Sequence, residues 1–259
     1  MISEIIKTLN SFNSIRLEEM ERVKLMDRVD TKYLLPANRV PDLLGMMQGR
    51  YQVLETGINR ISSYETVYLD TPDYYFFNQH VTDRPGRVKI RFRSYKLTGI
   101  TFLEIKRKTK KGRTIKWRIE NYFLDDKLNN NAVEFINSHL HIDNNELRPV
   151  LSNSFERITL AAFDRNERIT VDLNNSFVSP EGNSYKMPLV AIVELKSEGP
   201  AVRSPFSRLI KQFSSYPTGF SKYCIGCAML YDLPLKNILK SKILLINRIE
   251  NEYNGSLSA

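Results

Sequence analysis

The chain has 259 residues, and its 42% hydrophobic content is enough for a sizeable core. Its formal net charge of +9 predicts an anionic partner: nucleic acid, an anionic membrane surface or a phosphate-rich small molecule. Two cysteines exclude a disulfide framework, and no apolar run reaches the roughly 18 residues of a membrane span. The first residues lack a signal-peptide pattern, so we expect a cytoplasmic protein that would reach a membrane only through a separate partner.

Apolar residues at helical spacing predict helices, and strict alternation of polar and apolar residues predicts strands. The first part of the chain predicts one or two helices within residues 1–20, a strand at 28–35, a helix at 38–48, a strand at 63–70 and a short helix at 74–77. After a central strand at 87–95, the chain predicts strands at 102–108, 114–120, 149–160, 168–172 and 189–196, and helices at 130–140, 204–215 and within 227–259.

The most informative stretch runs from Arg87 to Arg93 and alternates cation and apolar residue without a break. As a strand it places four cations on one face: Arg87, Lys89, Arg91 and Arg93. Neighbours on one face are about 6.6 Å apart, so each pair repels by roughly 2.5 kcal/mol at an effective dielectric of about 20. Water and salt would remove most of this cost on an exposed face, whereas in a groove or tunnel only a polyanion would offset it.

Other predicted strands also separate a charged face from an apolar face. The charged sets are Arg28, Asp30 and Lys32; Glu104, Lys106 and Lys108; Lys116, Arg118 and Glu120; Arg168 and Asp172; and Glu194 and Lys196. Two architectures fit this pattern: a sandwich with its charges in water, or an inverted barrel with a charged lumen and helices covering an apolar outside. Pattern alone favours the sandwich, whereas the number of cations on each strand and the glutamates among them favour the inverted barrel.

Several motifs carry little functional information. Cys224 and Cys227 have redox or zinc spacing but no second cysteine pair, so two buried free thiols are expected. Glu194 lies in an apolar strand, where an ion pair with Lys196 and metal binding are equally compatible with the sequence. Ser221 has no evident histidine partner, which argues against a nucleophilic serine.

Nucleic acid is the main competitor to a phosphate-rich substrate. A protein that binds single strands needs aromatic rings among the cations of one face. Phe92 and Trp117 lie opposite the cations of their strands, which argues against base stacking and makes nucleic acid an unlikely partner.

The ordered motifs of the chain resemble the catalytic domain of the vacuolar transporter chaperone complex, the polyphosphate polymerase of the triphosphate tunnel metalloenzyme superfamily. The matching motifs are Arg28-x-Asp-Thr-Lys32-Tyr33, Tyr68-Leu-Asp70-Thr, Lys89-x-Arg91-x-Arg93, Glu104-x-Lys106, Arg157 after an aromatic residue, Arg168-x-Thr-x-Asp172, Val193-Glu194-x-Lys196 and Phe220-Ser221-Lys222-Tyr223. Each motif alone is weak, but eight in order are specific. The more widespread Glu-x-Glu-x-Lys signature is missing near the N-terminus, and the Arg-x-Asp-Thr-Lys version that begins at Arg28 favours the polymerase branch over the hydrolase and cyclase branches.

The resemblance implies an α+β fold: an eight-stranded antiparallel β-barrel tunnel with a charged lumen and helices packed on the outside. It implies one domain over residues 1–259, with a motif core at about 26–226, N-terminal helices at 1–20 and a C-terminal helical region and tail at 227–259. The implied catalytic cations are Arg91, Arg93, Lys106 and Lys222. The phosphate-binding set is Arg28, Lys32, Arg87, Lys89, Lys116, Arg118, Arg157, Arg168, Lys196 and Ser221, and the metal ligands for Mn²⁺ or Mg²⁺ are Glu194 and Glu104.

The implied activity is metal-dependent transfer of the γ-phosphoryl group of ATP to a polyphosphate chain inside this basic tunnel. A triphosphatase on the same fold and a non-catalytic polyphosphate- or RNA-binding module are the alternatives. Two positions depart from the expected pattern: Phe155 stands where a tyrosine is expected, and Gly219 stands where a lysine is expected.

Overall fold

The structure is a computed structural model that describes residues 1–20, 28–121, 128–140, 142 and 146–256. Its helices are α1 (Ile2–Asn10), α2 (Val40–Met47), α3 (Tyr75–Val81), α4 (Asn130–His139), α5 (Pro205–Lys211), α6 (Lys222–Leu230) and α7 (Lys240–Ser256). Its strands are β1 (Ser14–Ile15), β2 (Val29–Pro36), β3 (Gln52–Leu54), β4 (Ser62–Asp70), β5 (Val88–Tyr95), β6 (Ile100–Lys108), β7 (Thr114–Glu120), β8 (Arg148–Ala162), β9 (Glu167–Val178), β10 (Ser184–Met187) and β11 (Val190–Ser197).

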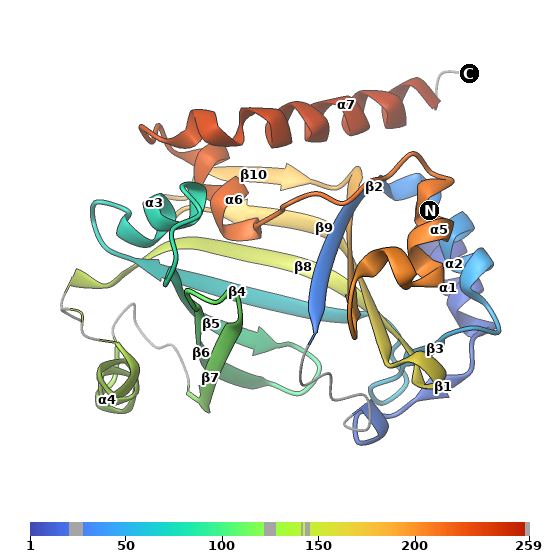
Figure 1. The fold of residues 1–259 in the computed structure, drawn as a ribbon, viewed down its shortest axis with the longest axis horizontal. Coiled ribbons are helices and arrows are strands. Elements are labelled where there is room, and N and C mark those ends of the chain that lie inside the picture. The colour runs from blue at the N-terminus through green and yellow to red at the C-terminus, as the bar shows by residue number, and fades with distance from the viewer. Residues whose placement is uncertain (21–27, 122–127, 141, 143–145, 257–259) are drawn as a thin grey trace.

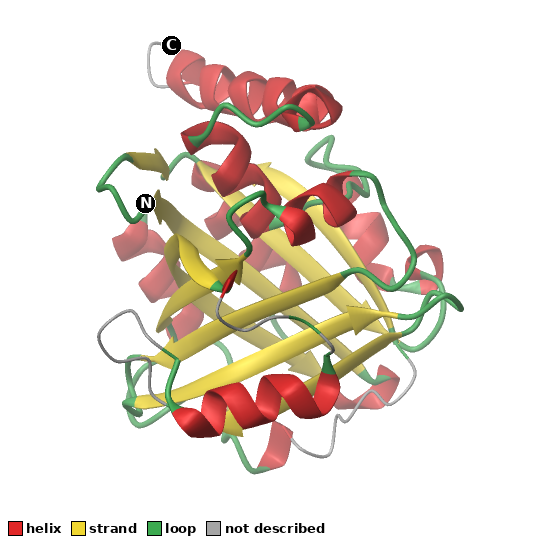
Figure 2. Ribbon diagram, turned by 90° about the vertical axis from the view of Figure 1, so that its left-hand side faces the viewer, coloured by secondary structure: helices red, strands yellow, loops and turns green. Residues whose placement is uncertain are grey.

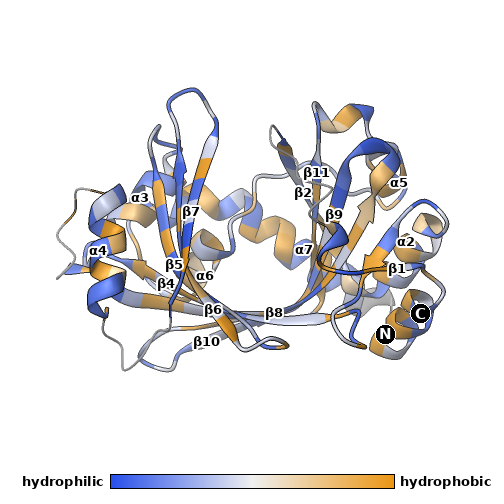
Figure 3. Cartoon of the chain, turned by 90° about the horizontal axis from the view of Figure 1, so that it is seen from below, coloured by the Kyte–Doolittle hydropathy of each residue, from blue (hydrophilic) through white to orange (hydrophobic). Residues whose placement is uncertain are grey.

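Eight strands make up the main sheet in the order β2-β11-β9-β8-β4-β5-β6-β7, and every neighbouring pair is antiparallel. Figure 3 shows this sheet curled, with β7 on one side, β2 and β11 on the other and β8 between them. The α+β class and the eight-stranded antiparallel order are confirmed. In the described part of the chain, however, β2 and β7 are not paired with each other, so the tunnel sheet is open rather than a closed barrel.

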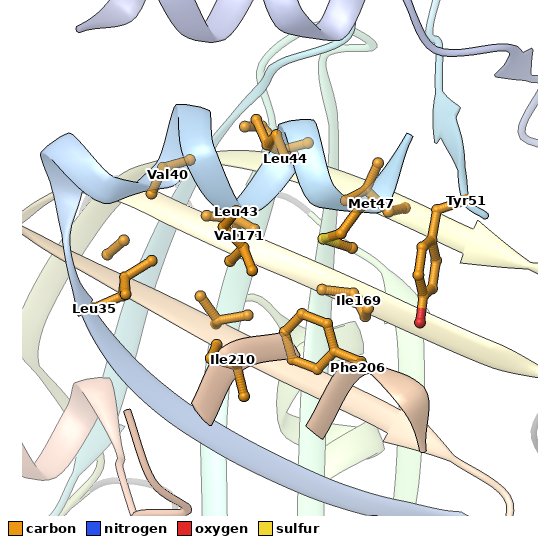
Figure 4. Close-up of a cluster of buried hydrophobic side chains, with 14 of the residues drawn as sticks. Leu35, Val40, Leu43, Leu44, Met47, Tyr51, Ile169, Val171, Phe206 and Ile210 are labelled. Carbon is orange, nitrogen blue, oxygen red and sulfur yellow. The ribbon is translucent and has the colours of Figure 1, made fainter. Parts of the chain in front are cut away.

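The outer face of the sheet is apolar. Helices cover it, as Figures 1 and 2 show. On one side, α1, α2 and α5 pack on β2, β8, β9 and β11, and Figure 4 shows α2 and α5 contributing Leu43, Met47 and Phe206 against Ile169 and Val171. On the other side, α4 and Phe76 of α3 cover β5 and β6. Burying one such side chain contributes roughly 1.5–3 kcal/mol, so these contacts favour the inverted arrangement over a sandwich with a charged outside.

Helix α6 lies over one end of the inner face. Leu34 and Ile192 share a strand face with Lys32 and Glu194, yet they belong to the hydrophobic cluster that includes Tyr223 and other residues of α6. The same cluster takes in α7, the helix drawn above β10 in Figure 1. The inner face is therefore apolar under α6 and charged beyond it.

Most predicted elements are present, with differences at the edges of the sheet. Within residues 1–20 one helix forms, and residues 14–15 pair with β3 as a short strand instead of a second helix. Both β8 and β9 are longer than predicted. Residues 26–27, 122–127, 141 and 143–145 of the predicted motif core and 257–259 of the predicted tail lie outside the described residues. No described helix is both long and apolar enough to span a bilayer.

Candidate active site

Strand register brings most of the predicted cations together on the inner face. Lys89 pairs with Lys106, which also pairs with Lys116; Arg91 pairs with Glu104, which also pairs with Arg118. On the opposite wall Glu194 pairs with Lys32, and Lys196 lies between Asp30 and Arg168. Side chains on paired residues of neighbouring strands point to the same face. The inner face in Figure 3 accordingly shows hydrophilic strands on both walls.

Glu194 joins two lysines on the β2–β11 wall. The Lys32 Nζ lies 2.7 Å from Glu194 Oε1, and Lys196 pairs with the other carboxylate oxygen. Burial raises the pKa of Glu194, but the two ammonium groups outweigh it and hold this pKa well below the usual range. Lys196 is also 3.6 Å from Asp30 Oδ2. The carboxylate is therefore ionised and already bound to cations.

On the β5–β7 wall, Glu104 likewise joins two cations, and its side chain is fully buried. Arg91 Nε donates to Glu104 Oε2 at 2.8 Å and Arg91 Nη2 donates to the same oxygen at 2.6 Å, while Lys116 pairs with Oε1. Burial raises the pKa of Glu104, yet the cations around it, Arg91 first among them, hold that pKa below its usual range. Both oxygens of this carboxylate are thus engaged by cations of its own wall.

A third carboxylate, Asp172, links the sheet to α6. Arg157 makes a bidentate contact with it at 2.6 and 2.8 Å, and Lys222 Nζ lies 2.6 Å from its Oδ2. Burial raises the pKa of Asp172, but the two cations lower it to about 2. Asp172 belongs to one of the predicted motifs but not to the predicted site residues. Its even spacing from Arg168 on an alternating strand is the signal that could have found it.

Phe155 is the aromatic centre of the site. Lys222 Nζ lies 3.4 Å from its ring centroid, and the guanidinium carbons of Arg157 and Arg93 lie at 5.1 and 5.7 Å. Tyr64 stacks on Phe155 at 5.2 Å and faces the same two arginines. Because the face of an aromatic ring carries partial negative charge, this pair holds three cations close together without a further carboxylate.

Other cations of the inner face lack full compensation. Lys89 donates to the Ser221 hydroxyl at 3.0 Å, and burial lowers its pKa to about 8. The positive charge of Arg91, reinforced by burial, lowers the pKa of Lys106 well below its ordinary value. Within the described residues, the Nε of Arg168 is buried without a hydrogen-bond partner. A bound anion would supply the missing acceptors and charge.

Three predicted phosphate-binding residues lie at the margin. Arg87 bonds to Asp83 and to backbone carbonyls of the turn before β5, so the structure does not bring it into the cation network. Arg28 is 38% exposed and pairs with Asp30 at 3.0 Å. Arg118 is exposed, with its guanidinium carbon 4.7 Å from the ring centroid of Phe102. Among the described residues, Arg87 and Arg118 share no carboxylate with the inner cations, and Arg28 reaches them only through the exposed Asp30 that it shares with Lys196, so these three are weaker candidates than the residues around Glu104, Asp172 and Glu194.

The helix that carries Lys222 is fixed to the sheet through Tyr223. Its hydroxyl donates to Asp70, which also accepts the backbone N–H groups of Phe76 and Phe77 at 2.8 and 2.9 Å. Asp70 ends β4, so one buried carboxylate joins β4, α3 and α6. This connection positions the start of α6, with Ser221 and Lys222, over the inner face.

The described residues contain no cluster of three or more acidic, histidine or cysteine side chains that could hold a metal by themselves. Cys224 and Cys227 are buried free thiols, as expected. Mg²⁺-type ions are commonly held by one or two carboxylates together with substrate phosphates, and Glu194 offers carboxylate oxygens near the under-compensated Arg168. Glu194 is 14% exposed whereas Glu104 is fully enclosed, so Glu194 fits a substrate-shared ion better.

Comparison with known proteins places this arrangement in context. The search of curated proteins finds no match. Among solved structures, a putative adenylate cyclase from Vibrio parahaemolyticus is 13% identical, with a TM-score of 0.46 over 76% of this chain and 97% of that one. A putative adenylyl cyclase from Hippeastrum, described as having a dominant triphosphatase activity, is 12% identical, with a TM-score of 0.49 over 81% of this chain and 99% of that one.

The family comparison covers most of the chain. A sequence profile of the VTC domain matches residues 27–231, which span every strand of the main sheet and the cations gathered on its inner face. The chain therefore belongs to the VTC domain family.

Proposed function

We propose that the protein is a metal-dependent polyphosphate polymerase that transfers the γ-phosphoryl group of ATP to a polyphosphate chain. Membership of the VTC family supports a triphosphate- or polyphosphate-related tunnel enzyme. The observation that carries the proposal is the surplus of buried and half-buried cations over carboxylates on the inner face. A substrate with several successive negative charges is what would offset that surplus.

In this proposal Arg91 and Lys106 of one wall and Lys32 of the other hold successive phosphates. Arg93, Arg157 and Lys222 converge at Phe155, where they would surround the transferring phosphoryl group. The carboxylates Glu104, Asp172 and Glu194 keep these cations at fixed positions before substrate arrives. Such preorganised charge is the main contribution a protein makes to phosphoryl transfer.

The transfer itself breaks the bond between the γ-phosphorus and the bridging oxygen of ADP. A new bond forms between the γ-phosphorus and a terminal oxygen of the acceptor chain, and ADP leaves with the bridging oxygen. Protonated Lys222 and the two arginines stabilise the negative charge spread over the equatorial oxygens. Mn²⁺ or Mg²⁺, held by Glu194 and by substrate oxygens, would add charge neutralisation at the leaving and transferring groups.

Incubation of the purified chain with ATP and Mn²⁺, followed by gel electrophoresis of the products, tests the proposal. Long phosphate chains are expected. Orthophosphate as the only product would indicate a triphosphatase, and unchanged ATP together with tight polyphosphate binding would indicate a binding module. A Lys222→Ala variant purified in parallel controls for contaminating kinases, because it should lose chain formation while a contaminant would remain.

A further inference from the structure

Four aromatic rings form a continuous row across four neighbouring strands of the inner face. The row runs from Phe155 on β8 through Tyr64 on β4 and Tyr95 on β5 to Phe102 on β6. The ring centroids are 5.2, 5.0 and 5.9 Å apart in that order. None of the four belongs to a hydrophobic cluster of the described residues, so ordinary core packing does not account for this aromatic row.

The two halves of the aromatic row differ in accessibility. Phe155 and Tyr64 are buried beneath the cations of the site. Tyr95 and Phe102 are only half-buried, and the exposed Arg118 lies over Phe102. The accessible half therefore combines aromatic surface with a planar cation, a pairing that suits a flat, electron-rich ligand.

This half lies one step along the sheet from the cations proposed to hold phosphate. Tyr95 follows Arg93 on the same face of β5, and Phe102 of β6 is the direct pairing partner of Arg93. Same-face neighbours on a strand are roughly 6.6 Å apart, a span that the ribose of a nucleotide can bridge. The other end of the charged face is closed, because Lys89 there meets Ser221 at the start of α6. A nucleoside attached to bound phosphates would accordingly extend toward the aromatic row.

We propose that Tyr95, Phe102 and Arg118 form a nucleobase-stacking subsite for the nucleoside triphosphate whose phosphates the cations hold. The proposal rests on the proposed function and specifies its donor substrate as a nucleotide bound through its base as well as its phosphates. Because every base has a π face, stacking of this kind would tolerate different bases and would distinguish nucleotides from inorganic tripolyphosphate.

Parallel titrations of the full chain with ATP and with inorganic tripolyphosphate, in the presence of Mn²⁺ at one salt concentration, test the subsite. Tyr95→Ala and Phe102→Ala should each weaken ATP binding about tenfold, the scale of stacking on one ring, and leave tripolyphosphate affinity within about twofold. Phe102→Tyr should restore ATP affinity. Tyr75→Ala is the matched control, since Tyr75 is 47% exposed on α3 and away from the inner face, and it should change neither affinity.

An equal loss of both affinities in Tyr95→Ala and Phe102→Ala would overturn the subsite, because the rings would then only support the cations. Unchanged ATP affinity in both variants, and in Arg118→Ala, would also overturn it. Arg118 is exposed, so its replacement remains informative even where an aromatic variant folds poorly. In each of these cases the proposed function remains supported if the unaltered chain binds tripolyphosphate. Failure of that chain to bind either ligand would remove the proposed function and the subsite together.

Discussion

At the scale of single residues, Phe155 shows how an apolar side chain can organise charge. Three cations lie near its ring, although two of them, Arg157 and Lys222, already share Asp172. The expected tyrosine would add a hydroxyl, but the ring face that attracts the cations is the same in both residues. The departure at this position therefore preserves the arrangement of the cations.

Replacing Phe155 with leucine should weaken triphosphate binding by roughly 2- to 30-fold, the equivalent of one cation–π contact of about 0.5–2 kcal/mol, because Asp172 still holds Arg157 and Lys222. Leucine keeps the site apolar but removes the attraction that holds Lys222, Arg157 and Arg93 together. Phe155→Tyr should retain affinity, which separates loss of the ring from a packing defect. Calorimetric titration measures both variants, and equal affinity of the leucine variant and the unaltered chain would contradict the role of the ring.

Lys222 predicts a pH dependence. Burial lowers its pKa to about 7, with Asp172 opposing and Arg157 reinforcing the shift. Since this pKa lies below that of a free lysine, the empty site loses the Lys222 proton as the pH rises through 7. A bound phosphate favours the charged form, so binding at pH 8 should be weaker than at pH 6 and should be accompanied by proton uptake.

Calorimetry in buffers of different ionisation enthalpy measures this uptake directly. In Lys222→Arg, which stays protonated over this range, the proton uptake should shrink. Lys89, whose pKa is lowered to about 8, would supply the remainder. Identical uptake in the variant and the unaltered chain would exclude Lys222 as the titrating group.

Glu194→Gln should retain triphosphate binding but lose turnover. The carboxylate repels phosphate unless a divalent ion lies between them, so its neutralisation should keep or raise affinity measured without metal. Loss of the shared ion should remove charge stabilisation worth several kcal/mol in the transition state. Steady-state rates with Mn²⁺ and metal-free titrations separate the two effects. Full metal-dependent turnover in the variant would reduce Glu194 to an ion-pair partner of Lys196 and make Glu104 the next candidate.

At the scale of elements, α6 is the part that completes the site. Its packing against the sheet depends on Gly226, where a Cβ atom would lie 2.6 Å from Leu151 Cδ2 and 2.7 Å from Phe177 Cδ1. This close approach holds α6 against the inner face, and Lys222 and Ser221 at the start of α6 are positioned there with it. A small change in the position of α6 would therefore move two site residues at once.

Gly226→Ala should destabilise the protein by about 1–3 kcal/mol, the usual cost of overpacking, and lower the melting temperature by several degrees. It should also weaken triphosphate binding, because α6 must shift away from β8 and β9. Gly45→Ala is the control: Gly45 lies in α2 with nothing within 4 Å of the added Cβ, so the same substitution should be neutral or stabilising. Thermal melting and titration of both variants check this, and an unchanged Gly226→Ala protein would contradict tight packing of α6.

The sequence predicted elements better than their assembly. The alternation of polar and apolar residues correctly predicted the charged and apolar faces of β5, β6 and β7. The face to which a side chain points depends only on its position along its own strand, so it can be read from the local sequence. It did not reveal short strands such as β1 and β10, which form through pairing with distant segments. The prediction that the aromatic rings lie opposite the cations was incomplete. It holds for Phe92 and Trp117, but Phe102 is paired with Arg93 and shares its strand face with Glu104, so aromatic rings also lie on the charged face.

At the scale of the whole molecule, the fold concentrates like charges on one face of a sheet and covers the other face with helices. Carboxylates from both walls and from β9 compensate part of this charge, and the rest is left for a ligand. The net charge of +9 alone could not distinguish such a site from a diffuse basic surface. A localised site differs from a diffuse basic surface in that its affinity for triphosphate depends on individual buried cations.

Arg93→Ala should therefore abolish triphosphate binding, whereas Lys110→Ala should change it little. Arg93 is buried on the inner face and donates to Thr66 at 3.3 Å, while Lys110 lies exposed in the turn between β6 and β7. Arg91→Ala should also abolish binding, and in addition destabilise the fold, because it removes both hydrogen bonds to Oε2 of the buried Glu104. Titrations at two salt concentrations measure these effects, since a diffuse surface would lose affinity by a similar small factor for every cation removed. Equal losses from Arg91, Arg93 and Lys110 substitutions would contradict a localised site and would return the inner face to the role of a general basic surface.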